Sequence, residues 1–191
     1  MKLRNLIALA GGAALLNACI PSINPFYTEK DLVFDNRLVG EWQTKDSGEK
    51  PETWNFTRDG DKAYKLLVTD KDGKQGRFEA HVFQLKQEYF LDLRPDECQY
   101  ATNQADLIAV CMFPGHLLAR VPQFEPELKL AFFDTEWLEK YVKTNPQSLA
   151  LHADDKARIL TGETGDLQRF VLQHLGEGEL FGKPGELIKR K

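Results

Sequence analysis

From residue 38 to residue 134, apolar and polar residues alternate along the chain with a period of two. This alternation places one set of side chains on each face of a β-strand. Polar turn sequences, two of them with Asp-Gly, separate the alternating segments. The pattern predicts antiparallel strands in a meander that closes into a barrel or packs as a sandwich. The segments are 52–57, 63–68, 77–82, 88–93, 116–121 and 127–133.

After residue 134 the apolar residues recur with a helical period. Residues 135–143 and 164–176 predict two amphipathic helices, the first capped by Asp134 or Thr135 and the second by Thr164. Residues 148–153 and 157–162 between the helices predict two more strands, and we expect the tail from 177 to be irregular. The expected fold is mainly β, with two late amphipathic helices, in one globular domain at 38–191.

The N-terminus has the pattern of a secretory signal. Lys2 and Arg4 precede an apolar run of 11 residues, LIALAGGAALL at 6–16. A transmembrane helix needs about 20 apolar residues, so this run is too short to span a bilayer. A positive start followed by a short apolar run is typical of a signal peptide.

The run ends in Leu16-Asn17-Ala18-Cys19, which resembles the lipobox of bacterial lipoproteins. The resemblance implies that residues 1–18 are a signal peptide and that Cys19 carries diacylglycerol and an amide-linked acyl chain. Isoleucine rather than aspartate at position 20 implies sorting to the outer membrane of a bacterial envelope, facing the periplasm. Acyl chains of this kind hold a protein stably, so the membrane is the expected partner through Cys19.

Residues 19–37 then form the lipidated cysteine and a tether, which could reach about 60 Å if fully extended. Four apolar residues of the tether are candidates to pack part of it on the domain: Phe26, Tyr27, Leu32 and Phe34. Acylation of Cys19 leaves Cys98 and Cys111, which an oxidising periplasm permits to form a disulfide bridge. The alternative is two free buried thiols. The cysteines and histidines lack zinc-site spacing, so we expect neither a metal nor a cofactor.

The segment DNRLVGEWQ at 35–43 resembles the first strand of the lipocalin and wider calycin barrels. In that family a Gly-x-Trp, here Gly40 and Trp42, closes the barrel floor, and a late arginine stacks on the tryptophan. Arg158 and Arg169 are the candidates for that arginine, whereas the family's Thr-Asp-Tyr is absent and the helix at 135–143 interrupts its run of strands. The region from residue 24 to 93 also resembles a recurring group of bacterial lipoproteins that implies no activity.

Aromatic residues crowd the first half of the predicted barrel. In a wide barrel they line an apolar cavity, and in a narrow barrel they form the core. The first functional hypothesis is non-enzymatic binding of a small apolar or amphipathic ligand. The alternative is an interaction or scaffold lipoprotein in envelope assembly, with a packed core. The candidate pocket residues are Trp54, Phe56, Tyr64, Phe78 and Tyr89.

Charge and motifs narrow the function classes further. The formal net charge is −4, and removal of the signal peptide takes away two basic residues, so we expect no nucleic-acid partner. The chain has no Gly-x-Ser-x-Gly nucleophile motif, and its histidines are far apart in sequence. We therefore expect no enzyme.

Overall fold

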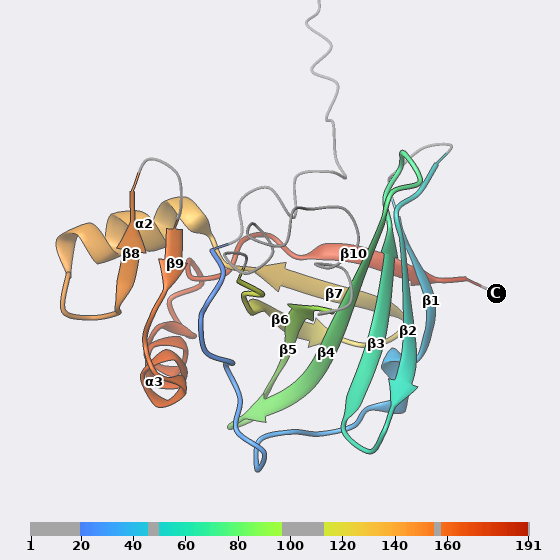
Figure 1. The fold of residues 1–191 in the computed structure, drawn as a ribbon, viewed down its shortest axis with the longest axis horizontal. Helices are drawn as coiled ribbons and strands as arrows, with labels where there is room; N and C mark the ends of the chain where they lie inside the picture. The colour runs from blue at the N-terminus through green and yellow to red at the C-terminus, as the bar shows by residue number, and fades with distance from the viewer. Residues whose placement is uncertain (1–19, 46–49, 97–112, 155–157, 191) are drawn as a thin grey trace, which may run out of the picture.

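A closed barrel of eight antiparallel strands forms the body of the molecule in the computed structural model (Figure 1). The structure describes residues 20–45, 50–96, 113–154 and 158–190. Seven strands follow one another as a meander, and the last strand closes the barrel between β7 and β1. The predicted β meander and its closure into a barrel are confirmed. The strands are β1 (Gly40–Thr44), β2 (Thr53–Asp59), β3 (Ala63–Thr69), β4 (Gln75–Leu85), β5 (Glu88–Pro95), β6 (Leu117–Gln123), β7 (Glu127–Phe132) and β10 (Gly185–Lys189).

The interior of the barrel follows directly from the alternation in the sequence. Trp42 and Trp54 are cross-strand partners on β1 and β2, and Phe56 lies two residues further along β2 on the same face. All three side chains are at most 2% exposed. Leucines, valines and alanines from the other strands complete this core. Burial of this apolar face is the main driving force for closing the sheet.

The closing strand β10 corrects the expectation of an irregular tail. Residues 185–189 pair with β7 on one side and with β1 on the other. Leu187 points into the core and is 4% exposed, whereas Ile188 is only partly buried. The alternation in this strand spans only a few residues after Lys183-Pro184-Gly185, so the pattern alone is too short to identify it.

A second layer covers one outer side of the barrel (Figure 1). It contains α2 (Thr135–Thr144), a separate two-stranded sheet of β8 (Leu151–Ala153) and β9 (Arg158–Leu160), and α3 (Thr164–His174). The two predicted late helices are therefore confirmed. A second apolar cluster joins this layer to the barrel wall, with Phe83, Phe90, Leu118 and Phe133 from the wall and Leu138, Leu167, Phe170 and Val171 from the helices.

The two helices begin differently. The Asp134 side chain accepts the Trp137 N–H at 2.8 Å and caps α2, as expected. The expectation that Thr164 caps α3 is wrong, because Glu163 holds the cap position and the Thr164 hydroxyl donates to the Pro25 carbonyl at 2.8 Å. Among the described helices, none is long and apolar enough to cross a membrane.

Residues 20–34, which we call the N-terminal strap, run along the outside of the barrel. The strap packs into the second apolar cluster as far as Leu32, and its last two residues, Val33 and Phe34, pack against the barrel core. Leu32 forms a bridge with Phe83 on β4, and the Val33 N–H donates to the Val82 carbonyl at 3.0 Å. Phe26 is 1% exposed within the second apolar cluster. The strap leads into a 3-10 turn, η1 (Asn36–Leu38), which enters β1.

We predict that Leu187→Ala lowers the free energy of unfolding by about 2–5 kcal/mol, because it leaves a cavity in the strand that closes the barrel. Ile188→Ala is the matched control on the opposite face of β10, and we expect a loss below about 1 kcal/mol. Urea denaturation of both variants measures the difference. Equal losses would contradict the role of β10 as the closing strand.

Candidate functional site

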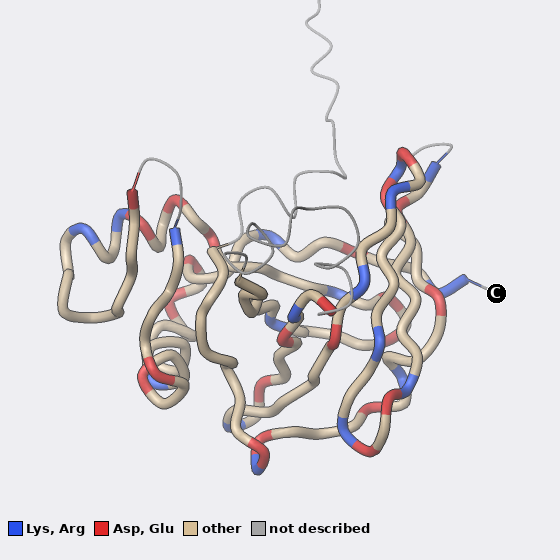
Figure 2. Tube along the Cα trace, in the orientation of Figure 1, with Lys and Arg blue, Asp and Glu red and all other residues tan. Residues whose placement is uncertain are grey.

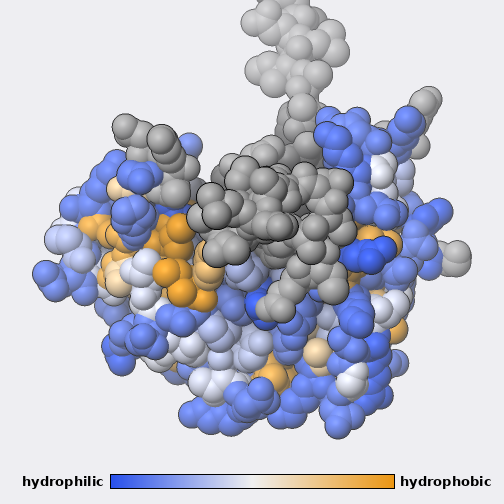
Figure 3. Space-filling model, in the orientation of Figure 1, coloured by the Kyte–Doolittle hydropathy of each residue, from blue (hydrophilic) through white to orange (hydrophobic). Residues whose placement is uncertain are grey.

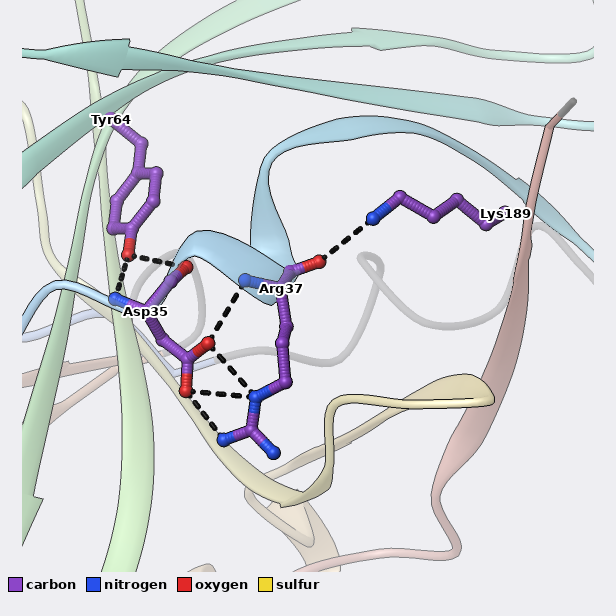
Figure 4. Close-up of polar contacts among 4 residues, drawn as sticks. All are labelled: Asp35, Arg37, Tyr64 and Lys189. Atoms are coloured by element: carbon purple, nitrogen blue, oxygen red, sulfur yellow. Dashed lines mark hydrogen bonds and ion pairs between the residues drawn. The ribbon is translucent and has the colours of Figure 1, made fainter.

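The barrel floor is held by a polar network around η1 (Figure 4). The Tyr64 hydroxyl accepts the Asp35 N–H at 2.6 Å and donates to the Asp35 carbonyl at 3.0 Å. The Arg37 backbone N–H and guanidinium donate to the Asp35 carboxylate. Lys189, on the closing strand, donates to the Arg37 carbonyl at 3.2 Å. These contacts hold η1 across the end of the barrel.

Gly40 and Trp42 lie at this floor. The Trp42 indole N–H donates to the Leu38 carbonyl at 2.8 Å, and its ring is fully buried. Gly40 has a φ of +130°, and a Cβ added there would lie 3.0 Å from Cε of Lys189, so a larger residue would be strained. The cation above the Trp42 ring is Lys189, with Nζ 5.1 Å from the ring centroid.

The expected late arginines lie elsewhere. Arg158 pairs with Glu139 of α2, and Arg169 pairs with Asp166 of α3. Both ion pairs belong to the second layer rather than to the barrel floor. The strand that carries Lys189 was not predicted, so the sequence offered no reason to select this residue.

The protonation states of Asp35 and Tyr64 at the floor favour a structural role for these residues rather than a reactive one. Hydrogen bonds from Arg37 hold the pKa of the Asp35 carboxyl below its usual value. Burial raises the pKa of the Tyr64 hydroxyl to about 12. At neutral pH, Asp35 is therefore ionised and Tyr64 is neutral, which are the states that these hydrogen bonds require.

The aromatic residues proposed to line a pocket come together inside the barrel. The ring centroids of Trp54 and Phe56 lie 6.2 Å apart, and those of Phe56 and Tyr64 lie 6.4 Å apart. Phe78 and Tyr89 are partly buried and pack against the same core. These rings contact one another and the surrounding aliphatic residues, so much of the interior is filled by the protein's own side chains.

A small cavity lies at the opposite end of the barrel, which we call the mouth. Its volume is about 20 Å³, enough for about one water molecule. At the mouth, the Glu52 carboxylate accepts the Trp54 indole N–H at 2.6 Å, and burial raises the pKa of Glu52. The lining residues are Thr44, Glu52, Trp54, Leu130, Phe132, Gly185, Glu186 and Leu187.

Three residues form a buried hydrogen-bonded cluster on the outer wall of the barrel, which we call the Asp92 cluster. Its members are the Asp92 side chain, the His116 ring and the backbone N–H of Phe26. Asp92 on β5 is 1% exposed. One of its oxygens accepts the Phe26 N–H of the strap at 3.0 Å, and the other lies 2.7 Å from Nδ1 of His116, just before β6. The cluster therefore joins the strap to two strands of the barrel.

The first residues of the strap complete the connection to the second layer. Ser22 and His116 exchange backbone hydrogen bonds of 2.8 and 2.9 Å. The Ile23 N–H donates to the Leu160 carbonyl of β9 at 2.9 Å. The strap thus lies as a short strand between β9 and the start of β6, two segments that are not otherwise paired in the described sheets.

Helix α3 holds the middle of the strap. The Gln168 amide donates to the Phe26 carbonyl and to the Asp31 carboxylate, both at 2.9 Å. The Asn24 amide donates to the Gly162 carbonyl at 3.0 Å. The segment expected to be a tether is therefore bound along its length from residue 20 onward.

Other predicted residues divide into two groups. Cys19, Cys98 and Cys111 lie outside the described residues. The histidines are dispersed, with His81 beside Tyr27, His152 beside Asp154 and His174 beside Glu177. Within the described ranges, no group of three or more His, Cys, Asp or Glu side chains could hold a metal ion.

The Asp92 cluster was missed by sequence reasoning. Asp92 falls on the outward face of the predicted strand at 88–93, where an acidic residue is ordinarily solvated. Its burial results from the strap, which comes from more than sixty residues earlier in the chain. The only available signal was the set of apolar residues in the strap, including Phe26 and Leu32.

Comparisons with known proteins provide no relative for this chain. No protein family, curated protein or solved structure matches it. Functional inference therefore rests on the residues and contacts described above.

We predict that Asp92→Ala lowers the free energy of unfolding by about 1–3 kcal/mol, because it leaves the buried Phe26 N–H without an acceptor. The freed strap should also become a substrate for limited trypsin cleavage after Lys30. Urea denaturation and mass mapping of the first cleavage test both effects. Asp61→Ala removes a fully exposed turn carboxylate and is the control. Wild-type stability and cleavage in Asp92→Ala would contradict the role of the cluster.

Proposed function

We propose that this protein is a non-enzymatic lipoprotein of the bacterial envelope, anchored by an acylated Cys19, whose barrel acts through its outer surface. In this proposal it is an interaction or scaffold protein for another envelope component. The observation that carries the proposal is the filled barrel, in which Trp42, Trp54, Phe56 and Tyr64 are at most 2% exposed.

The anchor is supported by sequence alone. A short apolar run after two basic residues ends at Leu16-Asn17-Ala18-Cys19, the pattern that resembles a lipobox. Isoleucine at position 20 favours the outer membrane, with the domain facing the periplasm. Two or three acyl chains are sufficient to hold the domain at the membrane without any further spanning segment.

Binding of a small ligand inside the barrel is the weaker proposal. Small-molecule sites have volumes of about 300–1,000 Å³. The cavity at the mouth is about 20 Å³, and it is bounded by Trp54 and Phe132 of the core. A ligand at this site would have to displace large buried side chains, and this cost favours the surface over the interior.

The outer surface has features that suit binding to another protein. Acidic and basic residues are interspersed along its strands and turns (Figure 2). Apolar residues gather over β8 and β9 in the second layer (Figure 3). The Asp92–His116 pair is covered by the strap, which supports a structural role for this pair rather than catalysis.

Native mass spectrometry of the full mature protein, solubilised from membranes, tests the anchor and the filled barrel together. We expect a chain that begins at Cys19, carries covalent acyl mass and holds no additional small molecule. An unacylated chain would contradict the anchor, and a retained apolar ligand in near-equal ratio to protein would contradict the filled barrel.

The control is a Cys19→Ala chain exported behind an ordinary cleavable signal. It should lack acyl mass and fractionate with soluble periplasmic proteins. Cys98→Ala, which removes a cysteine outside the lipobox, should remain acylated and bound to the membrane.

A further inference from the structure

The folded domain begins immediately after the proposed anchor. Ile20 is the residue that follows Cys19, and it is 2% exposed within the second apolar cluster. Ser22 is fully buried and hydrogen-bonded to His116. Consecutive Cα atoms lie about 3.8 Å apart, so no length of free chain separates Cys19 from the domain.

The side chains next to this point present an apolar surface. Ser22 pairs with His116 and Leu160, and all three side chains are buried. Because side chains alternate along an extended strand, Pro21 and Ile23 lie on the opposite, outward face. Ile23 is 44% exposed, which agrees with this arrangement.

Phe113 and Ile159 extend the same surface. A Cβ added at Gly115 would lie 2.7 Å from Cβ of Pro21 and 3.2 Å from the Phe113 ring, so these two side chains are neighbours of Gly115. Phe113 is 43% exposed, and it and Ile23 are the large apolar residues exposed among the described ones. Ile159 precedes the buried Leu160 on β9 and is partly buried. We call Pro21, Ile23, Phe113 and Ile159 the N-terminal face.

We propose that the N-terminal face rests on the lipid bilayer beside the acyl chains of Cys19, so that the membrane holds the barrel in one orientation. This inference rests on the proposed acylation of Cys19. With the strap bound to the barrel and to α3, acylation at Cys19 brings the residues that follow it to the level of the lipid headgroups. Exposed apolar side chains at that depth gain favourable burial in the interface.

The position of the anchor favours lipid over a protein as the occupant of this face. A partner protein on Ile23 would have to fit between the domain and the bilayer, directly beside the acylated residue. The formal net charge of −4 becomes more negative when the signal peptide and its two basic residues are removed, so net charge gives no attraction to anionic lipid. We therefore attribute the contact between the N-terminal face and the bilayer to burial of its apolar side chains in lipid and to the absence of a free tether.

Site-specific photo-cross-linking in membranes tests the proposal. The photoreactive amino acid p-benzoylphenylalanine replaces Ile23 or Phe113 in the full chain, and it replaces Thr57 or Asp61 in the controls. Both controls are exposed and lie at the end of β2 or in the β2–β3 turn, at the opposite end of the barrel from the start of β6. We expect phospholipid adducts at 23 and 113, and several-fold fewer at 57 and 61.

The outcomes separate this inference from the anchor on which it rests. The intact mass of each variant reports acylation of Cys19, and its absence would refute the anchor itself. In acylated protein, equal lipid adducts at all four positions, protein adducts at 23 and 113, or no adduct at these two positions would overturn the membrane-resting face.

A linker variant provides the matched comparison. Insertion of 20 Gly/Ser residues between Cys19 and Ile20 keeps the acyl anchor but adds a mean reach of about 25 Å. We expect this insertion to preserve membrane association and to lower the lipid adducts at 23 and 113. Unchanged adducts would show that the apolar face binds lipid without help from the short connection.

Discussion

The arrangement of the outer layer depends on the hydrogen bonds made by the buried carboxylate of Asp92. A buried carboxylate is costly unless its oxygens have partners, and here both oxygens have one. The Phe26 N–H brings in the strap, and His116 brings in the start of β6. Through these contacts the N-terminal segment becomes part of the folded domain, and α3 then packs over it with Gln168 and Thr164.

The barrel itself is closed by two strands that lie far apart in the sequence. β1 and β10 come from opposite ends of the domain, and they meet where Trp42 pairs with Lys189. This pairing places Lys189 over the Trp42 ring and under η1, so closure of the wall and closure of the floor use the same residue. Aromatic and aliphatic side chains together occupy much of the interior of this closed barrel.

The sequence predicts the local part of this structure well. Alternation between residues 52 and 133 identified the meander, and Asp134 was one of the two residues expected to cap α2. β10 was not predicted, because its alternation is too short to identify a strand without its pairing to β1 and β7. The burial of Asp92 was not predicted, because this residue looks solvated until the strap covers it. For the strap, only partial packing through its apolar residues was expected, and the polar contacts along it were not. Gly40 and Trp42 could be singled out from the sequence because they lie in one continuous segment.

We propose that an acyl anchor on Cys19 leads directly into the folded domain, without a free tether. Neutron reflectometry of the full protein, isolated from membranes and placed on a supported bilayer, measures the separation between lipid and protein. The account predicts protein density that begins at the headgroups, with no intervening water layer. A free tether over residues 20–36 could lift the domain by up to about 60 Å, and a hydrated gap of tens of ångströms would contradict the account.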